Sequence, residues 1–255
     1  MRVEPLRGAI SEARSIRDAM AARTPHMAGP IVVSGMLADQ LARELATGAE
    51  AGAVVVGGGI EPGGAEVAVH VVAGEPSDAD SAYAAAAGAL EVPVVLVQLW
   101  PQADWTPPFV LSPFVVECRA GEGFPVQEIA ARIAEAVEHP DALVARVPVL
   151  RAAVERRLVR ETVSRAALLG ILGARSRSLV TLEQIGLLTR LRAVESGKEH
   201  DPRANAVIAA SAIASGLAFR AAVHGRSGLG ARVLGGAVAA AGTLVLARAL
   251  SRLDL

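Results

Sequence analysis

The sequence predicts an α/β fold, in which a parallel-sheet domain is followed by an all-α helical domain. Val-rich runs of strand length alternate with helical segments up to residue 138, and the strand signals stop after residue 140. The chain is 52% hydrophobic but only 3% aromatic, so small aliphatic residues supply most of the core. Continuous apolar strands between helices are typical of a parallel sheet covered on both faces. We therefore expect an N-terminal helix within 1–29, an α/β domain over 30–140 and a basic helical domain over 141–255.

The elements before residue 140 follow from their apolar periodicity. An opening helix within residues 5–22 is predicted by one apolar face, made of Ile10, Ala13, Ile16 and Met20. The expected strands, in order, are "GPIVVSG", "AGAVVVGG", "AEVAVHVVAG", "VPVVLVQLW" and "PFVVECRAG". The expected helices among them are "MLADQLARELATGA", "DADSAYAAAAGAL", which begins at Asp78, and "FPVQEIAARIAEAVE".

Only helices are expected after residue 140. The segment "RVPVLRAAVERRLVRETVSRAALLGIL" has apolar residues on one side and dense Arg and Glu on the other. Thr181 followed by Gln184 has the spacing of a capping box, which predicts that the helix "LEQIGLLTRLRAVES" starts there. Asp201 before Pro202 predicts the start of a helix over "RANAVIAASAIASGLAFRAAV". The last expected helix is "RVLGGAVAAAGTLVLARAL".

The glycine-rich stretch "VVVGGGIEPGGAEVAV" lies where many α/β proteins hold a phosphate. A P-loop needs a Lys followed by Ser or Thr, but Gly64 and Ala65 occupy those positions when the motif is aligned from Gly58. The next expected element is a strand, so no helix N-terminus would face a phosphate. We interpret the stretch as a flexible connection between strands.

Charge divides the chain sharply. Residues 1–150 hold 9 Lys and Arg against 19 Asp and Glu, a net charge of −10, and residues 151–255 hold 16 against 7, a net charge of +9. This asymmetry predicts either two domains that attract each other or a basic half that meets an anionic partner. No secretory signal is recognised at the start of the chain, and the single Cys118 excludes an intrachain disulfide, so we expect a cytoplasmic protein.

The order of elements and one motif resemble the small GTPase domains. The segment "VVECRAGEGFPVQEIAARI" is similar to their last strand and Gly-x-Gly loop, with Cys118, Arg119, Ala120, Gly121 and Gly123 at the matching positions. The resemblance covers about residues 30–138. It implies a degenerate GTPase-like domain, because "SGMLADQL" has no Lys and "VPVVLVQLWPQAD" lacks the guanine-reading motif. Any remaining nucleotide binding would fall on Ser34, Gly35, Arg119, Gly121 and Gly123.

Other candidate sites carry weaker patterns. The five histidines have no acidic or cysteine partners at metal-ligand spacing, so we expect surface or hydrogen-bonded core positions and no metal or other cofactor. Cys118 is expected to be a small buried side chain, since a nucleophilic role would need a nearby base. Trp100 and Trp105 lie in a proline-rich loop, where they either form a contact surface or fold back onto the domain.

Two uncharged stretches distinguish the basic half. Residues 204–219 and 233–247 would each span about 22–24 Å as helices, short of the roughly 30 Å hydrocarbon layer. Small residues four apart in both stretches would let two helices approach closely. We consider a soluble helical hairpin, an interfacial or partly inserted hairpin, and a spanning one. The arginines expected to contact a membrane or partner are Arg220, Arg226, Arg232, Arg248 and Arg252.

The basic half also resembles a named family. The segments "LVTLEQIGLLTRLRAVESG", "GLAFRAAV" and "GAVAAAGTLVLARAL" are similar to the YcjF-like family of membrane-associated proteins, over about residues 124–255. Together with the charge division, this favours a non-catalytic scaffold or regulatory protein that docks peripherally at the inner membrane surface or on an anionic protein. The alternatives are a nucleotide-binding switch or related enzyme with non-standard loops, and a soluble module that binds a protein through its tryptophans. Nucleic acid is not an expected partner, because no aromatic residues interleave the arginines.

Overall fold

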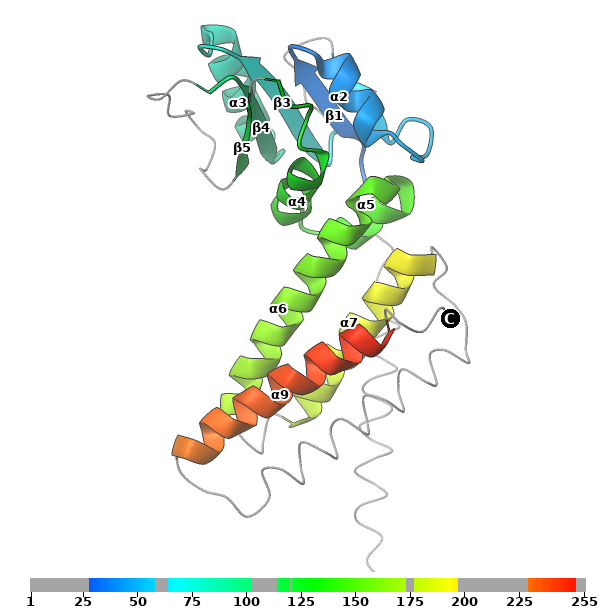
Figure 1. The fold of residues 1–255 in the computed structure, drawn as a ribbon, viewed down its shortest axis with the longest axis vertical. Coiled ribbons are helices and arrows are strands. Elements are labelled where there is room, and N and C mark those ends of the chain that lie inside the picture. The colour runs from blue at the N-terminus through cyan, green and yellow to red at the C-terminus, as the bar shows by residue number, and fades with distance from the viewer. Residues whose placement is uncertain are drawn as a thin grey trace, which may run out of the picture. The chain divides into compact units, whose positions relative to one another are not determined.

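The computed structural model describes residues 28–57, 64–101, 114–119, 121–172, 177–196 and 229–250. The chain divides into two compact units (Figure 1). One is formed by residues 26–157, and the other by residues 158–255 together with 1–25. The predicted helix 5–22 and the predicted helix over 203–223 lie outside the described residues.

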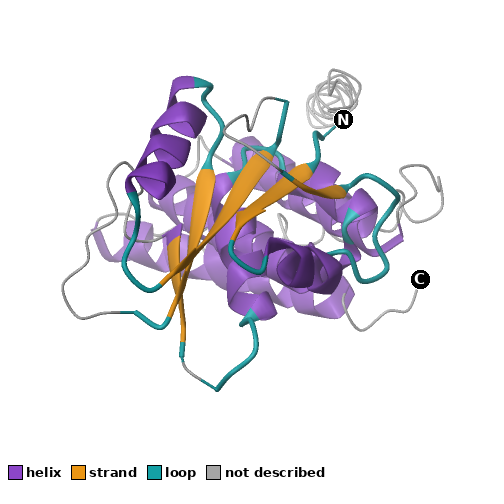
Figure 2. Cartoon of the chain, turned by 90° about the horizontal axis from the view of Figure 1, so that it is seen from above, coloured by secondary structure: helices purple, strands orange, loops and turns teal. Residues whose placement is uncertain are grey.

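The first unit contains a five-stranded sheet in which every pair of neighbours is parallel. Its order is β2-β1-β3-β4-β5, and the strands lie side by side in one twisted sheet (Figure 2). The strand bounds are Ile31–Gly35 for β1, Val54–Val56 for β2, Val67–Ala73 for β3, Val94–Leu99 for β4 and Val115–Cys118 for β5. The predicted α/β fold with a parallel sheet is therefore confirmed.

The strand order places helices on both faces of the sheet. Its helices are α2 (Ala38–Leu45), α3 (Asp78–Ala89) and α4 (Val126–Ala136). β1 and β3 are adjacent in the sheet. The chain leaves β1 toward β2 in one direction across the sheet and leaves β3 toward β4 in the opposite direction. Right-handed crossovers then put α2 and α3 on opposite faces. The β1–β3 boundary is the switch point of this sheet, outside which doubly wound proteins commonly bind their ligands.

The stretch after the sheet packs back onto the first unit. It comprises α5 (Pro140–Arg146), the 3-10 turn η2 (Pro148–Leu150) and the start of α6 (Arg151–Leu172). The Arg157 guanidinium donates to the carbonyl oxygens of Ala134 and Val137, so it caps the C-terminal end of α4. Because of this packing, the unit ends after Arg157, whereas the sequence placed a boundary after residue 140.

All described residues of the second unit lie in helices, namely the rest of α6, α7 (Arg177–Ser196) and α9 (Leu229–Leu250). The predicted capping box is wrong, because α7 starts before Thr181 and Gln184 lies inside the helix. The Gln184 side chain is buried and its Nε2 donates to Oγ1 of Thr243 at 3.0 Å. In the described part of the chain, no helix is long and apolar enough to span a bilayer.

Gly236 is a point of close approach between α6 and α9. A Cβ added there would lie 2.9 Å from the Ala167 carbonyl oxygen and 2.9 Å from Cγ1 of Ile171. A backbone carbonyl inside a helix cannot move aside without cost. Gly236 therefore lets α6 and α9 approach closely. The close approach predicted between helices over 204–219 and 233–247 stays a prediction, because residues 204–219 lie outside the described residues.

We expect Gly236→Ala to lower the free energy of unfolding by about 1–3 kcal/mol, because the added methyl group overpacks this contact. Gly88→Ala in α3 is the control, since a Cβ at Gly88 meets nothing within 4 Å. That control should be neutral or stabilising by up to about 1 kcal/mol, because Ala favours helix more than Gly. Thermal unfolding followed by circular dichroism measures both, and equal midpoints for the two variants would contradict the close contact.

Candidate functional site: the carboxyl edge of the sheet

A buried hydrogen-bond chain lies near the carboxyl ends of β1 and β3. Ser34 of β1 and His70 of β3 are directly paired in the sheet register. The Ser34 Oγ and the His70 Nδ1 are 2.8 Å apart, and the His70 Nε2 is 2.8 Å from Oδ1 of Asp80, in the first turn of α3. The chain thus joins two central strands to the helix that covers them.

Asp80 determines the direction of the hydrogen bonds in this chain. Its other carboxylate oxygen accepts from the Ser77 N–H and hydroxyl, both at 2.7 Å, in a capping box. Burial acts to raise the pKa of Asp80, but the hydrogen bonds from Ser77 and His70 outweigh it, and a protonated imidazole would add to their effect, so the pKa is lowered. An ionised Asp80 accepts from Nε2–H of His70. In a neutral imidazole, Nδ1 then accepts the Ser34 hydroxyl proton.

Tyr83 covers the His70 imidazole of this hydrogen-bond chain. Its ring stacks on the His70 imidazole, with centroids 4.4 Å apart and planes 16° apart. Burial raises the pKa of the Tyr83 hydroxyl, and the neighbouring Ser34 partly offsets this. The hydroxyl is buried and has no hydrogen-bond partner of good geometry among the described residues. Tyr83 also belongs to the apolar cluster under α3, with Ala68, Ala87 and Val92.

The order carboxylate, imidazole, hydroxyl is that of an acyl-transfer triad. A nucleophile must nevertheless reach its substrate, and Ser34 is only 4% exposed while His70 is 5% exposed. The stacked Tyr83 ring further covers the imidazole. In this arrangement Ser34 and His70 are satisfied inside the core by each other and by Asp80, whose side chain is 22% exposed, and such partners are what a buried polar side chain requires. Their chemistry here is to hold α3 on the sheet.

The turn after β1 is closed against β3 and does not form an open loop. Gly35 has a φ of +88°, and a Cβ there would collide with the Val71 carbonyl oxygen. The same oxygen accepts the Met36 N–H at 3.0 Å. The Ser34 hydroxyl is hydrogen-bonded to His70. The Ser34 and Gly35 candidates for nucleotide binding are therefore adjacent at the switch point, but both are engaged with β3.

Arg119, Gly121 and Gly123 lie beyond β5 on the same edge, and all three are exposed. β1 and β5 are separated by β3 and β4, which puts them about 14 Å apart at the usual strand spacing. The structure therefore brings the five candidates to one edge without placing the two groups side by side. The described residues contain no cluster of His, Cys, Asp or Glu that could hold a metal ion.

Cys118 ends β5 and is buried, as expected. Burial raises the pKa of its thiol to about 11, and the negative charges of Glu128 and Glu122 add to the effect. At neutral pH the group is therefore a thiol and a poor nucleophile.

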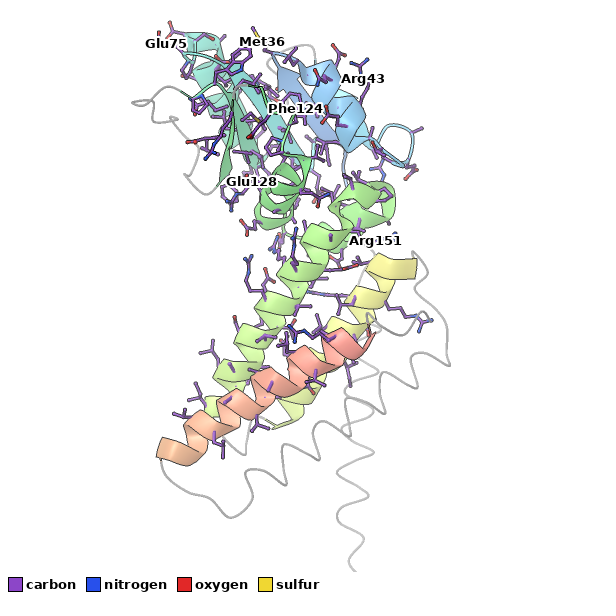
Figure 3. The ribbon with its side chains drawn as sticks, viewed as in Figure 1. Met36, Arg43, Glu75, Phe124, Glu128 and Arg151 are labelled. Carbon is purple, nitrogen blue, oxygen red and sulfur yellow. The ribbon has the colours of Figure 1, made fainter. Side chains whose placement is uncertain are left out.

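Exposed apolar side chains gather at the carboxyl edge. We call Met36, Leu37, Val56 and Trp100 the apolar rim; Met36 is 56% exposed and Trp100 51% exposed. Leu37 has a φ of 57° and Trp100 a φ of 54°, in the left-handed region that side-chain-bearing residues rarely adopt. Such strain concentrates at functional positions. Met36 lies at the end of the unit that also carries Glu75 (Figure 3).

The other predicted contact residues divide between described and undescribed parts. Trp100 is exposed, while Trp105, Arg220, Arg226 and Arg252 lie outside the described residues. Arg232 and Arg248 both lie in α9. The sequence missed the Ser34–His70–Asp80 chain. Its signal was one histidine inside the apolar run "VAVHVVA", which must find partners once that run becomes a central strand.

No family model matches the chain, and neither a curated protein nor a solved structure is significantly similar to it. We therefore infer its function from its own residues and their contacts.

We expect Asp80→Asn to lower the free energy of unfolding by about 1–3 kcal/mol at neutral pH, because it weakens the partner of a buried imidazole and the cap of α3. The folded-state pKa of Asp80 lies below its unfolded value of about 3.9. Its contribution is therefore present above about pH 4 and is lost as the pH falls through the folded-state pKa.

Urea unfolding at pH 7 and at pH 3 measures this change. The gap between the wild type and Asp80→Asn should narrow at the lower pH. Asp78→Asn, in the same turn of α3, is the matched control and should cost less than half as much. A constant gap at both pH values would contradict the assigned ionisation.

Proposed function

We propose that the chain is a non-catalytic scaffold or regulatory protein that attaches peripherally to an anionic membrane surface through its basic helices. The observation that carries the attachment is the charge of these helices. Together α6, α7 and α9 hold 10 arginines and 4 glutamates. Each basic residue near an anionic bilayer contributes about 1 kcal/mol, so four or five acting together suffice for reversible attachment.

In this proposal the first unit is a degenerate GTPase-like domain and the basic part a YcjF-like domain. The parallel sheet and the strand–helix order support the first assignment. The closed turn at Gly35, which engages Val71, and the missing Lys in "SGMLADQL" support the loss of nucleotide binding. The inward hydrogen bonds of Ser34 and His70 support a non-catalytic role, since neither group is free for substrate.

We expect vesicle binding to depend on the position of the arginines and not on the total charge. The test variant is Arg226→Gln with Arg232→Gln in the full chain. Two lost charges cost about 2 kcal/mol, or roughly 30-fold in partitioning to vesicles of 7:3 phosphatidylcholine and phosphatidylserine at low salt. Liposome flotation measures this.

The matched control is Arg43→Gln with Arg119→Gln, which removes the same charge from two exposed positions of the first unit. It should leave flotation within about twofold of the wild type. Equal losses in both variants would mean that only net charge matters, and a wild type that never floats would reject membrane attachment. The nucleotide-binding alternative is tested on the same protein: a thermal shift with millimolar GTP or ATP and magnesium would support it, and a flat response would reject it.

A second candidate function, a protein-binding module, is favoured by the apolar rim. Monomeric surfaces rarely gather exposed apolar side chains on strained backbone without a use for them. Exposed acidic residues follow the same strand ends, Asp39 after β1 and Glu75 and Asp78 after β3, so a basic protein partner fits this edge.

We expect Met36→Ser with Trp100→Ser to retain the fold, because both side chains are more than half exposed. If the rim is the contact surface, the double variant should lose at least tenfold in affinity for a bound protein, the effect of a missing central aromatic. Cross-linking in cells followed by mass spectrometry compares the partners of the two forms. A variant that folds and keeps every partner would exclude this candidate.

A further inference from the structure

The outward side of α9 is apolar from residue 233 to residue 245. Five exposed residues form what we call the outer stripe: Val233, Leu234, Ala237, Ala241 and Val245. Val233 is 60% exposed and Val245 65% exposed. Leu234, Ala237, Ala241 and Val245 recur three and four residues apart, so they lie on one face of the helix. A polar or charged face would be expected on a helix side that meets only water.

The opposite side of α9 is fixed by packing. Gly236 lies against Ala167 and Ile171 of α6. Ala239 belongs to a buried cluster with Ala166 and Val180, and Thr243 is fully buried. The Thr243 hydroxyl donates to the Ala239 carbonyl oxygen and accepts from the Gln184 amide. These contacts set the rotation of α9, so the outer stripe cannot turn inward without breaking them.

The end of α6 also exposes apolar side chains. Leu168 is 65% exposed and Ile171 is 44% exposed. Ile171 is also the residue that Gly236 approaches, so this end of α6 adjoins the first turns of α9. Two more exposed apolar side chains therefore lie near α9, beside its Gly236 side.

The charges of α9 lie at its two ends. Arg232 precedes the stripe and Arg248 follows it, with no charged residue from 233 to 247 and no acidic residue in the helix. Fifteen residues of helix are about 22 Å long. A helix of this length, apolar on its outer side and with arginines only at its two ends, fits the boundary between lipid headgroups and acyl chains.

We propose that the outer stripe of α9 is the surface that enters an anionic membrane, with α9 lying in the membrane plane. This inference rests on the proposed membrane attachment and adds that the attachment has an apolar component. Electrostatic attachment alone would be lost at high salt, whereas the stripe retains part of the binding. An acidic protein would form ion pairs with the arginines. It would cover the 22 Å of uncharged helix between them less favourably than lipid does.

The decisive experiment labels the full chain at Val245→Cys with an environment-sensitive nitrobenzoxadiazole probe. Cys118 is buried and its pKa is raised, so the new cysteine is labelled selectively. With vesicles of 7:3 phosphatidylcholine and phosphatidylserine we expect a several-fold rise in emission and quenching by lipid spin-labelled near the headgroup. A label at Asp39→Cys, exposed on α2, should change little.

Binding without any change at position 245 would overturn the inference and leave the proposed attachment intact. A wild type that binds no vesicles would overturn both. A rise in emission that depends on protein concentration without vesicles would mean that a second copy of the chain covers the stripe, which also overturns the inference.

A pair of substitutions tests the stripe at constant charge. Leu234→Ser with Val245→Ser should lower partitioning at least tenfold and abolish the binding that remains in 0.5 M salt. Val56→Ser with Leu90→Ser removes two similarly exposed apolar side chains from the first unit and should leave partitioning unchanged. Circular dichroism checks that each variant retains its helices. If both pairs bind as the wild type does, the stripe is not the membrane surface.

Discussion

The pairing of Ser34 with His70 across β1 and β3 is the constraint on which the first unit depends. A buried imidazole must have hydrogen-bond partners, and each one costs about 1–3 kcal/mol if left unmade. Ser34 supplies one partner from the neighbouring strand, and Asp80 supplies the other from α3. A slip of one residue between the strands would turn Ser34 to the opposite face and leave His70 unpaired. The same chain therefore fixes strand register and the seating of α3.

This constraint also decides what remains at the edge where ligands usually bind. Because Ser34 and His70 are used internally, and because Gly35 is pressed against Val71, the polar groups nearest the switch point face the core. The surface left over is the apolar rim, held partly on strained backbone at Leu37 and Trp100. In the second unit, too, internal contacts fix one side of an element and leave another side exposed. In α9 the inner side is fixed by Gly236 and Thr243, and an apolar side remains outside.

Much of the fold could be predicted from local sequence alone. All five strands lie within their predicted segments, and α3 begins at Asp78 as expected. The capping box of Ser77 and Asp80 that starts α3 is a local interaction as well. Buried parallel strands read as apolar runs whatever their neighbours are. The predicted start of α7 was wrong, because a non-local contact overrides the local signal there. The capping spacing of Thr181 and Gln184 is local, but Gln184 is instead held by Thr243, 59 residues away.

The sequence by itself thus determined the elements, the parallel α/β class and the division of charge between the two halves. The tertiary structure alone decided the strand order, the end of the first unit at Arg157, the Ser34–His70–Asp80 chain and the side of α9 that faces outward. The physical reason is the range of the interactions. Periodicity, capping and charge act over a few residues, whereas a buried hydrogen bond or a close helix contact joins residues that only folding brings together.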